Sequence, residues 1–135
     1  MISVIYANNE IGTIQQIHKI SKIIEEYRTK IKSHKKMYPF FHVDACQATE
    51  YLSMNVNSLG VDLLTFNGAK IYGPKGLAVL YVRKGVNIKP FIYGGDQENG
   101  LRAGTENVSA IAGLAKAVSL INSKDAKKVS VLRDY

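Results

Sequence analysis

The chain has 135 residues, of which 46% are hydrophobic and 21% are charged, with three prolines. This composition favours an ordered globular core and excludes a disordered chain. No apolar run is as long as a membrane span, and the first residues lack the basic and apolar regions of a secretory signal peptide. We therefore expect an ordered protein of the cytoplasm with no membrane association, and an organellar location stays open.

The formal net charge is +7, and basic residues gather in two groups. Neither group is interleaved with aromatic side chains, as a base-stacking surface would be. Both fall near predicted helix ends, where cations are favoured by the helix dipole and by solvation. Direct nucleic-acid binding is therefore not expected. The first group comprises Arg28, Lys30, Lys32, Lys35 and Lys36, and the second comprises Lys124, Lys127 and Lys128.

Strands and helices are predicted to alternate along the chain, as in an α/β domain. Residues 2–6 are predicted to form a short buried strand. A helix follows, with Thr13 and Gln16 as a capping box at its start. Its apolar residues recur at helical spacing, and they are Ile14, Ile17, Ile20, Ile24, Tyr27 and Ile31.

Two further apolar runs, residues 40–43 and 61–66, are predicted as strands that each deliver a polar residue at or just beyond the end. Residues 77–82 form another predicted strand, which follows too closely to allow a helical crossover and so should run antiparallel to its predecessor. Residues 107–123 are predicted as a helix, and the last residues start another. The helix carries one apolar face made of Val108, Ile111, Ala115 and Val118.

The strand at residues 40–43 delivers an acid and an amide, Asp44 and Gln47, to the edge where ligands gather in open α/β sheets. An aspartate there could pair with a protonated pyridine nitrogen, and Gln47 could donate to a phenolic oxygen. The alternative is that Asp44 caps a helix or accepts a bond from a local backbone amide. Its position upstream of a strand-end lysine favours the binding role.

The strand at residues 61–66 ends in the small-residue turn Asn67-Gly68-Ala69, which presents Lys70. At the rim of a sheet this amine should be partly desolvated, which lowers its pKa and makes it a nucleophile able to form a Schiff base. The alternative is a solvated lysine ahead of the Gly-Pro turn at residues 73–74. The other motifs of the chain favour the nucleophile.

The remaining reactive residue types indicate structural roles. Cys46 is the only cysteine, which fits a reducing compartment, and its apolar neighbours favour a small buried residue over a nucleophile. His18, His34 and His42 are too scattered for a zinc site, and no metal site is expected. Residues 73–76 lack the spacing of a nucleotide-binding phosphate loop.

Two more segments complete a set of four motifs: Ala-Asn-Asn-Glu-Ile-Gly-Thr at residues 7–13 and Gly-Leu-Arg-Ala-Gly-Thr at residues 100–105. With residues 44–48 and 70–76 between them, in this order, the chain closely resembles the cysteine desulfurases. These are class V aminotransferases that use pyridoxal 5'-phosphate. The resemblance runs from about residue 2 to the C-terminus, with an apparent local expansion at residues 28–38.

The resemblance implies a role for three residues at the cofactor ring. Lys70 would bind the cofactor covalently and later move the proton on the substrate Cα. Asp44 would pair with the pyridine nitrogen, and Gln47 with the ring hydroxyl.

Three further roles follow from the same resemblance. Asn9 would lie beside the cofactor and the substrate carboxylate. Asn67 stands where the family has a phosphate-binding serine. Thr105 resembles the threonine that reaches the phosphate bound by the partner subunit, which implies a homodimer.

The chain departs from the family pattern at two places. Asn67-Gly68-Ala69-Lys70 replaces Ser-x-His-Lys, so a hydroxyl and an imidazole are absent, although the Asn67 amide still donates hydrogen bonds. Asp96 stands where a glycine is usual, and its carboxylate would repel a phosphate unless it points away or pairs with Arg102.

The resemblance implies part of a fold type I large domain: a mostly parallel sheet with one antiparallel strand, flanked by helices. Residues 1–135 would belong to this single cofactor-binding domain, with its N-terminal part and a smaller C-terminal domain absent. The family's ring-stacking aromatic and phosphate loop would lie upstream of the matched part. Its persulfide cysteine and carboxylate-binding arginine would lie downstream.

The implied activity is the removal of sulfur from L-cysteine, which leaves L-alanine and an enzyme persulfide. A sulfur-acceptor or scaffold protein would take that sulfur for iron–sulfur clusters or transfer-RNA thiolation. The alternatives are another class V aminotransferase, a selenocysteine lyase, or a truncated chain without catalysis. The chain alone is expected to be inactive.

Overall fold

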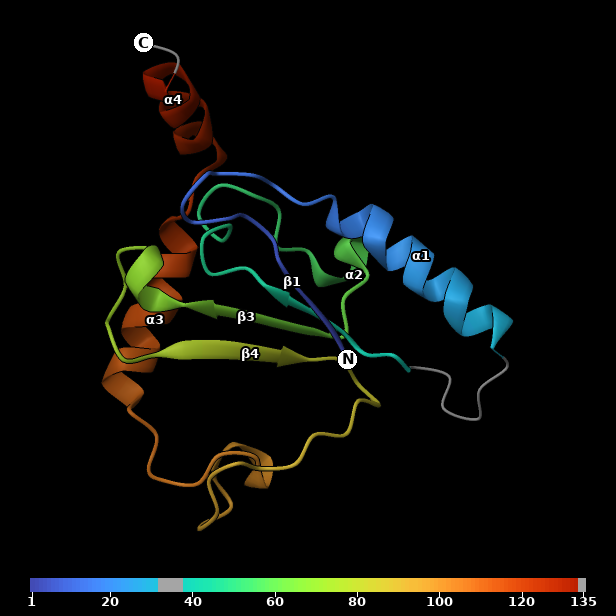
Figure 1. Ribbon diagram of the computed structural model, residues 1–135. Helices are drawn as coiled ribbons and strands as arrows, with labels where there is room; N and C mark the ends of the chain where they lie inside the picture. Colours follow the sequence, from blue (N-terminus) through green and yellow to red (C-terminus); the bar gives the residue numbers. More distant parts are fainter. Residues whose placement is uncertain (32–37, 134–135) are drawn as a thin grey trace.

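The computed structural model describes residues 1–31 and 38–133, which form a sheet with helices packed against it (Figure 1). The strands pair in the order β1-β2-β3-β4. The first three run parallel and the last runs antiparallel to β3, as the sequence predicted. Their bounds are β1 Ile2–Ile5, β2 Phe41–Asp44, β3 Leu63–Asn67 and β4 Ala78–Val82.

Helices fill the connections between these strands and follow β4. They are α1 Ile17–Lys30, α2 Val56–Leu59, α3 Val108–Leu120 and α4 Ser123–Arg133, with two short 3-10 helices, η1 Gly68–Lys70 and η2 Gln97–Gly100. Within residues 1–31 and 38–133, no helix is both long and apolar enough to cross a membrane.

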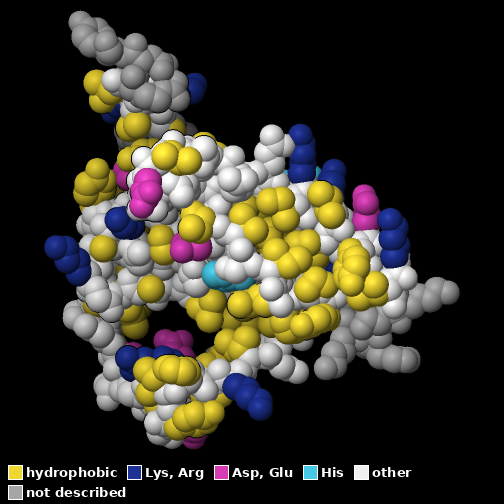
Figure 2. Space-filling model, in the orientation of Figure 1, with side chains coloured by type: hydrophobic (Ala, Val, Ile, Leu, Met, Phe, Trp, Pro, Cys, Tyr) yellow, Lys and Arg dark blue, Asp and Glu magenta, His cyan; other side chains and the backbone are white. Residues whose placement is uncertain are grey.

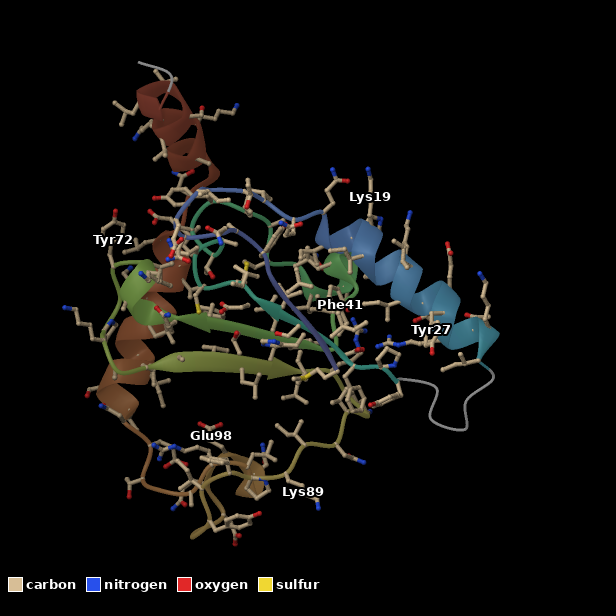
Figure 3. All side chains as sticks on the ribbon, in the orientation of Figure 1. Lys19, Tyr27, Phe41, Tyr72, Lys89 and Glu98 are labelled. Atoms are coloured by element: carbon tan, nitrogen blue, oxygen red, sulfur yellow. The ribbon has the colours of Figure 1, made fainter. Side chains whose placement is uncertain are left out.

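The main core lies between the sheet and α1. Along β2, Phe41 and Val43 are fully buried whereas His42 and Asp44 are half-buried, which is the alternation expected of a strand with one covered face. Ile17 and Ile24 of α1 pack on the covered face. Figure 3 shows Phe41 between the sheet and α1. Burial of each such side chain stabilises the fold by about 1.5–3 kcal/mol.

α3 covers the same face of the sheet beside a second apolar cluster. Leu114 and Ala117 of α3 are buried with Ile71, and Phe66 of β3 packs against both clusters. Since side chains two residues apart on a strand share a face, α1 and α3 lie on one side of the sheet. α3 therefore packs against the end of the sheet where β3 leads into the lysine turn.

Two predictions for the N-terminal region were wrong. β1 is exposed rather than buried, because it is the edge strand and Ile2 and Ile5 have open faces. α1 begins at Ile17, and its N-cap residue Gln16 makes no side-chain hydrogen bond, so there is no capping box. Ile14 matches the helical spacing but pairs with Ala7 in an isolated bridge, which holds this segment in a loop.

The apolar face of α3 marked in the sequence does not face the core. Val108, Ile111 and Val118 are exposed, and Leu114 and Ala117 make the contact with the sheet. Apolar residues surround most of α3, so its periodicity does not single out one face. The face of α3 that contacts the sheet is favoured by its small residues, such as Ala117, because a small side chain lets the helix approach the chain beneath it.

Residues 85–107, called here the arm, loop away from β4 before the chain returns to α3 (Figure 1). Figure 2 shows a hollow between the arm and the body of the molecule, and apolar side chains gathered on the arm. Phe91 is 96% exposed and Tyr93 is also exposed. Val86 and Ala103 are the buried residues of the arm.

The predicted basic groups differ in how the structure places them. Arg28 lies in the last turn of α1 as expected, but its side chain is buried rather than solvated. Lys30 is exposed. Lys32, His34, Lys35 and Lys36 lie outside the described residues, as does the side chain of Lys124.

Candidate functional site

Neighbouring strands bring the main candidate residues to one edge of the sheet. Asp44 ends β2 and pairs in register with Thr65, and β3 ends two residues later at Asn67. Because β2 and β3 are parallel, their carboxyl ends meet at the same edge, and Lys70 follows directly in η1. The predicted convergence of Asp44, Asn67 and Lys70 is therefore present in the fold.

Cys46 lies among these three side chains and reports their proximity. The Asp44, Asn67 and Lys70 side chains lie near enough to its thiol to influence the thiol pKa. Burial raises the pKa of the Cys46 thiol to about 11, and the Asp44 carboxylate adds to the rise. The thiol is therefore protonated at neutral pH, which supports a structural rather than a nucleophilic role.

Asp44 also has a local backbone partner. The backbone N–H of Cys46 donates to Asp44 Oδ1 at 3.0 Å. This is the alternative role considered from the sequence, and it leaves Asp44 Oδ2 as an acceptor for a ligand. A carboxylate oriented by one local bond is suited to hold a cationic ring nitrogen with the other oxygen.

The turn that carries Lys70 is closed by hydrogen bonds. Lys70 N donates to Asn67 Oδ1 at 3.2 Å, so Asn67 is the N-cap of η1. Ile71 N and Gly73 N both donate to the carbonyl oxygen of Gly68, at 3.1 and 2.8 Å. These bonds fix where the backbone of Lys70 lies relative to β3.

Lys70 itself is exposed, so the prediction of a partly desolvated amine was wrong for this chain. The cause is the form of the turn: Gly68 is buried beneath it, while Ala69 and Lys70 face outward. Tyr72 follows with a positive φ of 59° and is 89% exposed. Figure 3 shows Tyr72 at the margin of the molecule beside η1.

Gln47 contributes an unsatisfied polar atom. Its Oε1 is buried and has no hydrogen-bond partner in the part of the chain that the structure describes. Such an atom usually marks a missing ligand or water, because buried polar groups in folded proteins are almost always bonded. An amine, a carboxylate and an unsatisfied amide at one sheet edge fit the polar groups of pyridoxal 5'-phosphate.

Asn9 and Thr105 are not joined to this group. Both are exposed, and neither side chain makes a hydrogen bond to another candidate within the described residues. Asn9 lies in the loop after β1, and that loop is shaped by Asn8, whose Oδ1 accepts from the backbone of Glu10 and Ile11. Thr105 lies near the C-terminal end of the arm, just before α3.

Arg102 does not pair with Asp96. Its Nη1 donates instead to the backbone oxygen of Ala103 at 2.7 Å. The Asp96 side chain is exposed, so its carboxylate is solvated at the start of η2. Neither residue belongs to the group at the ends of β2 and β3.

His42 supports the site from within the sheet. Its Nδ1 lies 2.7 Å from Ser3 Oγ and its Nε2 lies 3.3 Å from Thr65 Oγ1, so it links β1, β2 and β3. Burial lowers the pKa of His42, and the neighbouring Asp44 opposes this shift. Both ring nitrogens of His42 therefore have a partner, and the sequence did not identify Thr65 as one of them. The alternation of side chains along β2 and β3 was the signal in the sequence that could have pointed to this pairing.

The comparisons with known proteins bear on this arrangement. Residues 1–133 match the family model described as aminotransferase class-V. The chain belongs to the class-V aminotransferase family. The resemblance read from the four motifs is therefore confirmed, together with its expected α/β fold and mostly parallel sheet.

Curated members of the class-V family include the cysteine desulfurase IscS of Dictyoglomus turgidum. It is 47% identical over all of this chain and 32% of its own length. IscS of Methanosarcina thermophila is 45% identical over 92% of this chain and 28% of its own length. The chain thus spans about a third of the length of the curated relatives that it matches.

Solved structures of the family agree with the fold. A NifS-like protein superposes with a TM-score of 0.77 at 41% identity, covering 88% of this chain and 30% of its own. A NifS-like protein from Rickettsia africae superposes with a TM-score of 0.79 at 38% identity, covering 93% and 32%.

Proposed function

We propose that this class-V chain supplies the cofactor lysine of a pyridoxal 5'-phosphate-dependent cysteine desulfurase. The observation that carries the proposal is that β2 and β3 run parallel, so that Asp44 at the end of β2 and the lysine turn after β3 lie at the same edge of the sheet. The unpartnered Gln47 Oε1, three residues after Asp44, supports it. The names of the relatives support it, since two of them at 45% and 47% identity are cysteine desulfurases. L-cysteine is the proposed substrate, with L-alanine and a persulfide as products.

Pyridoxal 5'-phosphate, when bound, supplies an electron sink for bonds at the substrate Cα. Asp44 would hold a protonated ring nitrogen through a charge-assisted bond of about 1.5–3 kcal/mol. The unsatisfied Gln47 side chain would bond to the ring hydroxyl, since its amide can both donate and accept. The Lys70 amine would form the covalent link to the cofactor and would move the Cα proton.

On the phosphate side, Asn67 retains a donor. Its Oδ1 accepts from Lys70 N, while its amide nitrogen is available for a phosphate oxygen as well as for the Cys46 thiol. Asn9 is proposed to lie beside the cofactor and the substrate carboxylate. Asn67 would thus hold the lysine turn and the phosphate with different atoms.

We propose that the protein is a homodimer in which Thr105 reaches the phosphate bound by a second copy. The arm supports this proposal, because it carries exposed Thr105 on a segment that also presents the exposed side chains of Phe91 and Tyr93. Apolar side chains on a projecting segment are typical of an interface.

The proposal also covers the domain to which the chain belongs and the partners of the protein. Residues 1–135 would form part of one large cofactor-binding domain of a cytoplasmic protein, completed by further segments and a smaller domain. A sulfur-acceptor or scaffold protein would receive the sulfur for iron–sulfur clusters or transfer-RNA thiolation. Measurement of sulfide release against amino transfer to a keto acid would separate a desulfurase from another class-V aminotransferase.

The role of Lys70 is tested by trapping its covalent link. The protein as its gene encodes it is incubated with pyridoxal 5'-phosphate, reduced with borohydride and digested, and the labelled peptide is mapped. The expected label is on Lys70, and exposed Lys75 in the same loop is the matched control. A label on Lys75, or on no lysine, would contradict the proposal. Cysteine-dependent sulfide release that survives Lys70→Ala would also contradict it.

A further inference from the structure

α3 lies close against the lysine-bearing loop at Gly113. A Cβ atom at Gly113 would lie 2.7 Å from Pro74 Cγ and 3.3 Å from Pro74 Cδ. Carbon atoms that are not bonded pack at about 3.5–4.0 Å. Any side chain at position 113 would therefore push Pro74 away from α3 by roughly 1 Å if the helix kept its place.

Pro74 in turn presses on the turn that carries Lys70. A Cβ atom at Gly68 would lie 2.7 Å from the carbonyl oxygen of Pro74 and 3.2 Å from Leu114 Cδ1. Gly68 is the first residue of η1 and Lys70 is the last. Pro74 is thus held between α3 and the first residue of the lysine turn, with no space on either side.

Hydrogen bonds link the same backbone segments. Gly73 N, next to Pro74, donates to the carbonyl oxygen of Gly68, and Gly68 N donates to the carbonyl oxygen of Leu77 at 3.1 Å. A shift of Pro74 is therefore passed to Gly68 by covalent geometry and by a hydrogen bond. The Asn67 side chain ties Lys70 N to the last residue of β3, and Gly68 lies between these two residues in the chain. A shift of Gly68 therefore changes the backbone geometry of the turn that sets the direction of Lys70.

We infer that Gly113 is a positioning residue for Lys70: its missing side chain lets α3 hold Pro74 and Gly68 where the lysine turn needs them. This inference rests on the proposed function for the role of Lys70. Displacement of a reacting group by 1 Å can slow a reaction by about 100-fold. Gly113 would then govern the reaction rate without touching the substrate or the cofactor.

The test is a steric rescue. Gly113→Ala introduces the clash, Pro74→Ala removes the ring atoms that Gly113→Ala would meet, and the double variant combines them. Ser119→Ala, on the exposed side of α3, is the matched control. On helix propensity alone Gly113→Ala stabilises α3, so any damage reports the contact with Pro74.

Two readouts follow each variant of the protein as its gene encodes it: amide hydrogen exchange across residues 68–77 and α3, and the rate of borohydride-trapped labelling of Lys70 by pyridoxal 5'-phosphate. Gly113→Ala should speed exchange at Ile71 and Gly73 and slow labelling at least tenfold, with α3 still protected. The double variant should recover both, and Ser119→Ala should match the unmodified protein.

Unchanged exchange at residues 68–73 in Gly113→Ala would overturn the inference, as would a double variant that stays defective. Faster exchange throughout α3 without rescue would show a structural role only. If Gly113→Ala does not fold, recovery of folding in the double variant supports the contact and its absence overturns it. If the unmodified protein fails to label Lys70, the proposed function fails, while the exchange data still decide whether Gly113 holds the turn.

Discussion

Arg28 of α1 and Asp62, the residue before β3, form an ion pair inside the fold. Their side chains are only 9% and 3% exposed. Asp62 Oδ2 also accepts from the backbone N–H of Phe41 at 2.7 Å, and Arg28 Nη2 also donates to the carbonyl oxygen of Pro39. The Arg28–Asp62 pair, together with these two hydrogen bonds, therefore ties α1 to the starts of β2 and β3.

Asp62→Asn should destabilise the fold by about 3–5 kcal/mol, because it leaves the Arg28 guanidinium buried without its charge partner. Arg83 Nε, at 3.6 Å from Asp62 Oδ1, would lose the same partner. Urea unfolding followed by circular dichroism measures the change. The control is Glu25→Gln, because Glu25 also contacts Arg28 but is 70% exposed, and its loss should cost less than about 1 kcal/mol. Equal costs for the two variants would show that burial does not govern this pair.

Asp44→Asn should separate cofactor binding from folding. The asparagine keeps an oxygen for the Cys46 N–H, so urea stability should change little, whereas the negative charge is lost. Affinity for pyridoxal 5'-phosphate should fall roughly 10- to 100-fold. Absorbance titration measures this affinity, and a variant with undiminished affinity would exclude pairing between Asp44 and the ring nitrogen.

Asn67 offers a test of the departure from the family's serine. Asn67→Ser keeps an oxygen that can cap η1 and should retain both stability and cofactor binding. Asn67→Ala removes the bond from Lys70 N and should cost about 1 kcal/mol of folding stability, with weaker binding of pyridoxal 5'-phosphate. If the alanine variant bound as well as the serine variant, Asn67 would have no part in holding the phosphate.

His42 should make the fold sensitive to mild acid. Burial lowers the pKa of its imidazole, with Asp44 opposing the shift, so the folded chain binds this proton less readily than the unfolded chain. The stability that depends on the neutral ring is fully present above the ordinary pKa of about 6.5 and is lost as the pH falls below it. His42→Gln should flatten the dependence of urea stability on pH between about 7.5 and 5. An unchanged slope would assign the acid sensitivity to other groups.

Cys46 should react slowly with alkylating reagents. Its pKa of about 11, against the ordinary 9.0, lowers the thiolate fraction at neutral pH by about 100-fold. Iodoacetamide labelling followed by mass spectrometry should be at least that much slower in the folded chain than in denaturant. Rapid labelling of the folded protein would reopen the possibility that Cys46 accepts sulfur.

The sequence was sufficient for relationships set by the chain itself. The short connection between β3 and β4 required antiparallel pairing, and two strand-end residues, Asp44 and Lys70, had to meet at one edge once β2 and β3 were parallel. Local spacing could not establish that Ile14 pairs with Ala7 instead of extending α1. That outcome depends on contacts that only the folded chain makes.

The burial or exposure of individual charged residues could not be predicted from the sequence either. Arg28 and Lys30 lie in the same helix turn, but only Arg28 reaches Asp62, which is distant in sequence. Lys70 was expected to be partly covered, but the form of η1 directs it outward. In both cases the place of the residue on its element was correct. The direction of the Arg28 side chain is set by its contact with Asp62, and that of Lys70 by the local form of the turn.

The connection from Lys30 to Phe41 joins the end of α1 to the start of β2, whereas Asp44 and Lys70 gather at the opposite end of the strands. The end of α1 therefore lies away from the proposed chemical groups. Exposed Lys30, the last residue of α1, offers an attachment point for a fluorescent label at this end. Such a label would report on the protein from the side opposite its proposed chemistry.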